Sequence, residues 1–206
     1  MSNGIRLKYG GLFLCIASVL SGCAKNSMTK SGFLGDYDAL SPTKYDNVLM
    51  YRATGFEPAR YANIVVDDAI IKTASGRLDG LDKKQQREVL DYIDSELRHQ
   101  QTKAIVTPGA VGRIRVRVAI TELETPNRAV NAFTTLLVGP VTTGGASLEF
   151  EAIDESTGRR IAAATCFERG NVFTEFVGSY KLLGHAKSAI TTCIEQIDNA
   201  WRDTHA

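Results

Sequence analysis

The sequence predicts an α+β fold, in which a mixed and largely antiparallel sheet is covered by two amphipathic helices. Residues 113–120 alternate apolar and basic side chains, which is typical of a strand with one buried face. Residues 148–153 and 161–167 flank a turn and predict a β-hairpin. Residues 82–99 and 184–201 carry apolar side chains at helical spacing. The hairpin requires an antiparallel pair, and the two helices need one apolar sheet face to cover, so we expect a two-layer body.

Short extended segments precede the first helix. Residues 48–52 are a candidate strand, and the β-branched run over 64–66 is typical of a buried one, which residues 70–71 extend past a bend. The helix over 82–99 begins with Asp82 and Gln85 at the spacing of a capping box. Its apolar stripe consists of Val89, Leu90, Ile93 and Leu97.

The strand over 113–120 places two sets of side chains on opposite faces. Its core face carries Ile114, Val116, Val118 and Ile120, and its other face carries Arg113, Arg115 and Arg117. One interpretation is an anion site for phosphate, lipid A or a peptidoglycan carboxylate, because arginine forms bidentate pairs with such groups. The other is a solvated sheet face on which the arginines pair across strands with Glu149 and Glu151. We favour the second interpretation, because solvated antiparallel sheet faces are common.

The apolar region over 129–146 is too short and too broken to cross a membrane as a helix. It could contact a partner or a membrane, because exposed apolar patches often mark such sites. We favour a crossover that covers the core, with a short helix over 129–138, because most apolar residues lie inside proteins.

The C-terminal part combines the hairpin with the second helix. Residues 154–158 have the composition of a turn between the two hairpin strands. The final helix carries an apolar stripe of Ala186, Ile190, Cys193, Ile197 and Trp201.

The N-terminus has the organisation of a secretory signal. Arg6 and Lys8 precede an apolar run over 12–20, which is about half the length that a membrane-spanning helix needs. The tetrapeptide Leu20-Ser21-Gly22-Cys23 resembles a bacterial lipobox, which implies that residues 1–22 are removed and that Cys23 is lipidated. An ordinary signal peptide cut nearby is the alternative. In proteins with such a motif, Ala24 and Lys25 after the cysteine imply the outer membrane, facing the periplasm.

We expect a lipidated tether and an ordered aromatic arm over 23–58, followed by a globular domain over 59–206. Residues 24–30 are polar and lack periodicity, as in a tether. Residues 31–40 are too apolar for a linker and predict an arm that packs on the body. Its aromatic residues, Phe33 and Tyr37, are candidate contacts for a partner.

Two cysteines remain in the mature chain besides the lipidated one. We expect Cys15 to leave with the signal peptide and Cys23 to carry the lipid. Cys166 and Cys193 would lie in an oxidising compartment, where disulfides persist. They form either one disulfide or two separate buried thiols, and their spacing alone does not decide between these alternatives.

No feature of the sequence indicates catalysis, a metal or a cofactor. His99, His185 and His205 are scattered without the spacing of metal ligands, and no nucleophile or phosphate-binding motif is present. Asp67 and Asp68 are adjacent, so we expect solvated loop residues rather than a working pair of carboxylates. Removal of the signal changes the formal charge from +1 to −1, which gives no general reason to bind nucleic acid.

Several motifs resemble an uncharacterised family of proteobacterial lipoproteins, which is defined only as a domain of unknown function. They are Ser-Gly-Phe-Leu-Gly-Asp-Tyr over 31–37, Pro108-Gly109 before the arginine strand, the hairpin over 148–154 with Thr157-Gly158, and Arg169-Gly170. The hairpin is also similar to those of curli-secretion and penicillin-binding-protein-activator lipoproteins. The chain departs from the family pattern over 167–179. The resemblance implies no catalytic residue, because the family has none assigned.

We therefore expect a non-enzymatic lipoprotein of the outer membrane. It would bind or scaffold a protein partner in envelope transport, secretion or cell-wall assembly, or form a homo-oligomer. The alternative is a module that binds an anionic small molecule or glycan through Arg113, Arg115 and Arg117.

Overall fold

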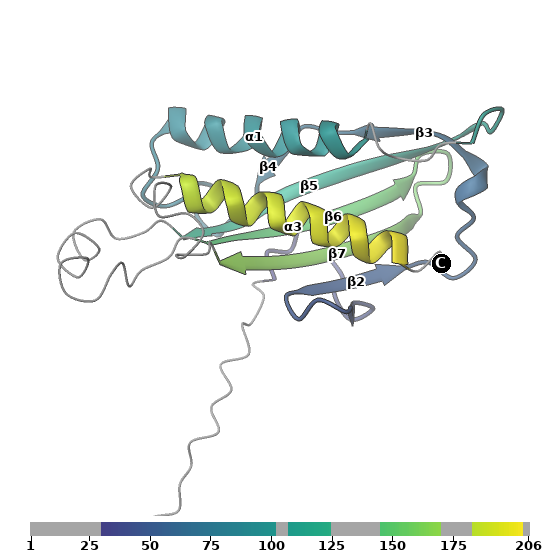
Figure 1. The fold of residues 1–206 in the computed structure, drawn as a ribbon, viewed down its shortest axis with the longest axis horizontal. Helices are drawn as coiled ribbons and strands as arrows, with labels where there is room; N and C mark the ends of the chain where they lie inside the picture. Colours follow the sequence, from purple (N-terminus) through teal and green to yellow (C-terminus); the bar gives the residue numbers. More distant parts are fainter. Residues whose placement is uncertain (1–29, 102–106, 125–144, 170–182, 204–206) are drawn as a thin grey trace, which may run out of the picture.

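The fold is built on one seven-stranded sheet with both long helices on the same side (Figure 1). The computed structural model describes residues 30–101, 107–124, 145–169 and 183–203. The strands are β1 (Ser41–Pro42), β2 (Val48–Arg52), β3 (Tyr61–Val66), β4 (Ile70–Ile71), β5 (Gly112–Glu124), β6 (Gly145–Asp154) and β7 (Arg160–Arg169). The helices are α1 (Lys83–Gln101) and α3 (Gly184–Asp203), with a 3-10 turn η1 (Pro58–Arg60). The α+β architecture predicted from the sequence is confirmed.

The sheet is mixed because α1 connects two parallel strands. Its order is β1-β2-β7-β6-β5-β3, with β4 also paired to β5. The neighbours from β1 to β5 are antiparallel, whereas β3 and β4 both run parallel to β5. A parallel pair needs a long crossover, which the helix supplies. β2 belongs to this sheet, so the sheet begins before residue 59, within the range that we assigned to tether and arm.

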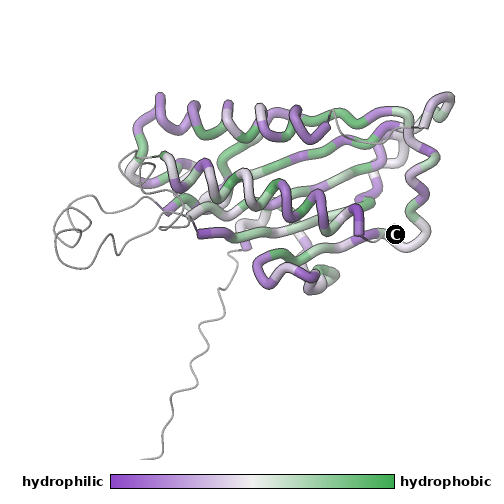
Figure 2. The backbone as a smooth tube through the Cα atoms, viewed as in Figure 1, coloured by the Kyte–Doolittle hydropathy of each residue, from purple (hydrophilic) through white to green (hydrophobic). Residues whose placement is uncertain are grey.

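Both hydrophobic and hydrophilic residues lie along the strands (Figure 2), and the two faces of the sheet have different characters. On the face toward the helices, Val118, Ile120 and Leu148 are at most 1% exposed. We call the opposite face, which carries the β5 arginines, the polar face. A register shift between Ile120 and Glu122 returns Leu123 to the helix side. The predicted alternation of β5 therefore holds up to the bulge, beyond which one extra residue resets it.

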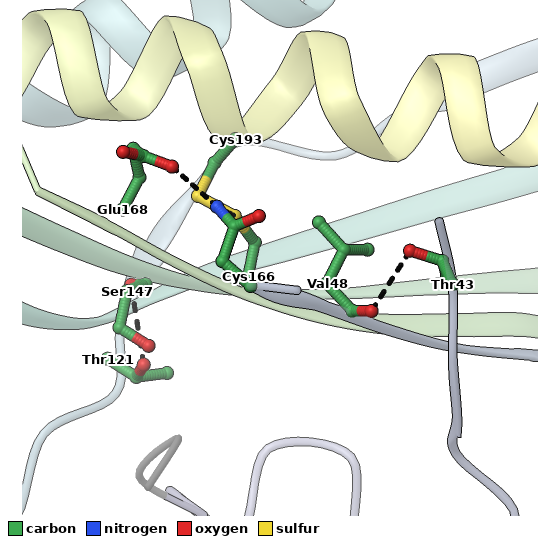
Figure 3. Close-up of a disulfide and its surroundings, with 8 residues drawn as sticks. Thr43, Val48, Thr121, Ser147, Cys166, Glu168 and Cys193 are labelled. Carbon is green, nitrogen blue, oxygen red and sulfur yellow. Dashed lines mark hydrogen bonds between the residues drawn. A yellow bond between two sulfur atoms is a disulfide. The ribbon is translucent and has the colours of Figure 1, made fainter. Parts of the chain in front are cut away.

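A disulfide joins the sheet to the second helix. Cys166 of β7 and Cys193 of α3 are bonded, with their Cα atoms 5.7 Å apart and both side chains fully buried (Figure 3). The structure thus selects one of the two alternatives left open by the sequence. Because α3 packs on β7, β6 and β2, the bond ties the helix to the middle of the sheet.

The sequence predicts a capping box at Asp82 and a turn over 154–158, and hydrogen bonds are present at both places. At the start of α1, the Asp82 and Gln85 side chains each accept a hydrogen bond from the other's backbone N–H, at 2.8 and 2.9 Å. In the hairpin turn, Asp154 accepts hydrogen bonds from the Ser156 hydroxyl at 2.6 Å and the Tyr61 hydroxyl at 2.9 Å. The Ser156 hydroxyl, followed by Tyr61 and Thr157, holds the pKa of Asp154 far below its usual range.

Four predicted features lie outside the described residues. They are the signal peptide with Cys23, the tether over 24–29, most of the apolar region over 129–146, and His205. Among the residues that the structure does describe, neither helix combines the length and hydropathy that a membrane span requires.

Removal of the disulfide should destabilise the fold. The bond closes a loop with a sequence separation of 27 residues, so loss of its constraint on the unfolded chain should cost about 3 to 4 kcal/mol. Chemical denaturation of the wild type with and without reductant measures this cost. The double variant Cys166→Ala/Cys193→Ala is the control, because reductant should leave its stability unchanged. An unfolding midpoint of the wild type that does not move on reduction would contradict the prediction.

The charge of Asp154 should make the stability of the fold depend on pH in the acidic range. Since its pKa is lower in the folded than in the unfolded state, the ionised form stabilises the fold above about pH 4. This contribution is lost as the pH falls through the folded-state pKa. We expect Asp154→Asn to be less stable than wild type by about 1 kcal/mol at neutral pH. Urea unfolding should show the difference narrowing below about pH 4. An exposed control, Asp79→Asn, should show no such trend.

Candidate functional site

The three β5 arginines lie on the polar face, and each is paired with a carboxylate. Arg117 donates to Glu151 at 2.9 Å, directly across the β5–β6 pair. Arg115 donates to Glu155 at 2.6 Å and to Asp67 at 3.3 Å, and Arg113 lies 2.6 Å from the second oxygen of Glu155. An anion would have to compete with these three carboxylates, so the arginine site stays a prediction without support from the geometry.

The prediction of a solvated sheet face is wrong for the two glutamates of β6. Glu149 is fully buried and Glu151 is 7% exposed. Glu151 pairs with Arg117 as predicted, but Glu149 lies opposite Ala119 in the register and does not pair with a β5 arginine through any described contact. The physical reason is that the arm over 31–40 lies on this part of the face.

The arm is held by hydrogen bonds to the buried carboxylate. The Tyr37 hydroxyl donates to Glu149 Oε2 at 2.7 Å, and the Ser31 backbone N–H donates to Oε1 at 3.0 Å. Burial, followed by the hydrogen bond to Glu149, raises the pKa of Tyr37. The phenol therefore stays protonated at neutral pH and remains a donor.

Further contacts from the sheet fix the arm along its length. Arg160 of β7 donates to the carbonyl oxygens of Leu34 and Asp36, and it also donates to Glu151 at 2.7 Å. The Phe33 ring lies 5.2 Å from the Arg117 guanidinium. Leu34 is 2% exposed. The arm packs on the body as predicted, and Phe33 and Tyr37 both contact the sheet. Their role as contacts for a partner stays a prediction.

A groove lies on the other side of the sheet, between the C-terminal halves of α1 and α3. Its volume is about 180 Å³. We call it the α1–α3 groove. Its floor contains Ala152, Ala162 and Ala164, its walls contain Leu97, Ile194 and Ile197, and its rim contains Gln100, Gln101, Asp198 and Trp201.

Small side chains in register create this groove. Ala152 of β6 pairs with Ala162 of β7, and Phe150 pairs with Ala164. At the next helix-facing position of the β6–β7 pair, Leu148 and Cys166 fill the same layer, and Cys166 is bonded to α3. Sequence reasoning missed the groove. The signal that could have found it is the cluster of alanines over 162–164 with Ala152 across the hairpin.

An aromatic group flanks the groove. Trp201, near the end of α3, packs against Phe56 with ring centroids 5.0 Å apart. The Arg52 guanidinium lies 4.9 Å from the Trp201 ring and 5.2 Å from the Phe56 ring. Burial lowers the pKa of Arg52. These contacts attach the C-terminal end of α3 to the segment that follows β2.

The remaining polar candidates do not form a shared centre. Asp67 pairs with Arg115, whereas Asp68 is exposed and lies 3.8 Å from Arg98, in agreement with the loop predicted there. His99 lies on α1, and His185 is buried at the start of α3. Within the described ranges, no group of three or more potential metal ligands comes together.

Comparison with known proteins gives a family. A model described as "Protein of unknown function (DUF3313)" matches residues 29–197. The chain belongs to the DUF3313 family. The match begins just before the arm and ends within α3, so the arm belongs to the same family domain as the sheet and the helices. No curated protein matches the sequence of this DUF3313 protein.

Solved structures resemble this DUF3313 protein only distantly. A PelC dodecamer from Paraburkholderia phytofirmans has a TM-score of 0.41 and 17% identity, covering 70% of this chain and 95% of that one. The hypothetical protein CT253 from Chlamydia trachomatis has a TM-score of 0.37 and 9% identity, over 68% and 97% of the two chains. Lipoprotein GNA1162 from Neisseria meningitidis has a TM-score of 0.30 and 13% identity, over 67% and 99%. These likenesses carry no functional argument.

Loss of the Tyr37 hydroxyl should destabilise the protein through Glu149. Tyr37→Phe leaves a buried carboxylate with one donor fewer, which should cost about 1 to 3 kcal/mol. In a Glu149→Gln background the same change should cost less, because the partner no longer carries a charge. Urea unfolding of the four proteins in this cycle gives the coupling energy. Tyr51→Phe is the control, since Tyr51 lies on β2 and is not among the described donors to Glu149. Equal costs in both backgrounds would contradict the role of Glu149.

Proposed function

We propose that this DUF3313 protein is a non-enzymatic lipoprotein of the outer membrane that binds a protein partner in the periplasm. Its acyl chains would be attached to Cys23. The partner would belong to envelope transport, secretion or cell-wall assembly. The observation that carries the proposal is an open apolar groove on the face of the sheet opposite the arm.

The position of the arm supports an orientation on the membrane. The described chain begins at Lys30, and the backbone N–H of the neighbouring Ser31 donates to Glu149 on the polar face. Residues 24–30 would then span at most about 25 Å between Cys23 and this face. A body held so closely would turn its polar face toward the bilayer. The two helices and the α1–α3 groove would face away from the membrane, where a partner can reach them.

The disulfide supports a location outside the cytoplasm. Structural disulfides persist in oxidising compartments such as the bacterial periplasm and are rare in the cytosol. The bond between Cys166 and Cys193 is fully buried in the core. A chain that depends on it for stability would be suited to the compartment that the signal peptide predicts.

The chemistry of the described residues favours binding over catalysis. An activated nucleophile or a general base needs a neighbouring group that shifts its pKa or orients it toward the substrate. Here the arginines of the polar face are engaged by carboxylates within the fold, and Glu149 is engaged by the arm. The α1–α3 groove has apolar walls and a polar rim, as binding sites do. The arginine alternative has no comparable observation in its favour.

Replacement of Cys23 tests the anchor. In Cys23→Ser the thiol that receives the acyl chains is gone, and each buried acyl CH₂ contributes about 0.8 kcal/mol to membrane binding. We expect the variant to move from the outer-membrane fraction to the soluble periplasm and to take no fatty-acid label. The arm and body should remain folded, because Cys23 is not among the residues that make the described contacts of the arm. A wild type that takes no label, or a variant that stays in the membrane, would contradict the anchor.

Recovery of a partner tests the binding function itself. Affinity purification of the wild type from membranes in several mild detergents should recover a second envelope protein. Cys23→Ser should recover less of it, because loss of the anchor lowers the local concentration at the membrane without altering a contact. Recovery of the lipoprotein alone in every detergent would count against the proposed function, whatever the anchor experiment shows.

A further inference from the structure

We propose that the α1–α3 groove binds one bulky, uncharged side chain of the partner polypeptide, such as a phenylalanine ring. The inference rests on the proposed function and names the chemistry that the groove recognises. An aromatic side chain seated in such a pocket is a common centre of a protein interface, surrounded by weaker contacts.

The size of the groove fits a single ring. Its volume is about 180 Å³. An enclosed apolar cavity of about 150 Å³ accepts benzene. The groove is therefore large enough for a phenyl ring with its methylene and too small for a longer chain to coil inside it.

The groove is a consequence of the strand register rather than of loose packing. Native interiors are close-packed, so an apolar gap of this size needs a specific cause. Here Ala152 and Ala162 face each other, and Ala164 follows at the next helix-facing position. The larger layer beside them contains Leu148 and Cys166, and Cys166 is bonded to α3. The alanines lie beneath the same helix and leave the space open.

The rim offers hydrogen-bonding groups that suit a peptide. Gln101 donates its side-chain N–H to the Ile64 carbonyl, and Asp198 accepts from Arg202 at 2.7 Å. These internal bonds hold the two rim side chains in place. Together with Gln100, these side chains provide the rim with amide and carboxylate groups that can hydrogen-bond to a peptide backbone.

The orientation of the arm favours a protein over a lipid as the source of the apolar group. Ser31 enters the sheet on the polar face, and the alanine floor lies on the opposite face. A groove turned away from the bilayer would not meet the alkyl ends of membrane lipids. It would meet a protein approaching from the periplasm.

The chain contains its own reporter for this test. Trp201 is the single tryptophan of the sequence and lies on the rim of the α1–α3 groove. Tryptophan fluorescence of the full-length protein should therefore report on occupancy of the groove. The probe is N-acetyl-phenylalaninamide, which carries one ring on a neutral peptide unit and does not absorb at the red edge of tryptophan excitation.

The expected result is a saturable change in Trp201 emission at millimolar probe concentrations. N-acetyl-alaninamide, which has the same peptide unit without the ring, should produce no change. In Ala152→Leu the added side chain fills the groove, so binding of the ring should weaken at least about tenfold. Ala162→Val is a second filling variant, to be used if the first does not fold. Val111→Leu is the matched control, because Val111 is 95% exposed and its enlargement should leave binding unchanged.

Three results would overturn the inference. They are no saturable change with the ring probe, binding of the ring probe by the folded filling variant that is as tight as binding by the wild type, and saturation by 1-hexanol without saturation by the ring probe. The last would assign the groove to an alkyl end. These outcomes are separable from failure of the proposed function. If a partner is still recovered from membranes by Ala152→Leu at the wild-type level, the partner function stands and the groove is not its site.

Discussion

The arrangement of this DUF3313 protein depends on one buried carboxylate. Glu149 lies on a central strand, fully removed from solvent. A buried charge is costly unless it is hydrogen-bonded, and the described donors to it are Tyr37 and Ser31, both from the arm. The sheet therefore needs the arm in place. The point where the chain enters the body follows from this requirement.

The two faces of the sheet consequently have separate roles in our account. The polar face holds the arm through Glu149 and Arg160 and compensates its own charges by internal pairs. The opposite face carries the core, the disulfide to α3 and the α1–α3 groove. Since the sheet separates them, a tether on one side leaves the groove on the other side accessible. The Cys166–Cys193 bond maintains this division by tying α3 to β7.

Much of the fold could be predicted from local patterns, and the rest depends on what packs against each element. The alternation in β5, the apolar stripes of both helices and the capping box at Asp82 are local signals. The alternation shows that Glu149 and Leu148 lie on opposite faces, but not that a distant arm covers one of them. Predicting the bond between Cys166 and Cys193 would have required the distance between β7 and α3. Predicting the groove would have required the register that brings Ala152 opposite Ala162.

The orientation of the body on the membrane tests this account most directly. Energy transfer from a single tryptophan to dansyl-labelled lipid head groups, measured on the lipidated protein in liposomes, compares the two faces. The wild type carries its tryptophan at Trp201, beside the groove, and the variant Phe33→Trp/Trp201→Phe moves it to the arm. Our account predicts much stronger transfer from position 33 than from position 201. Equal transfer, or stronger transfer from Trp201, would contradict it.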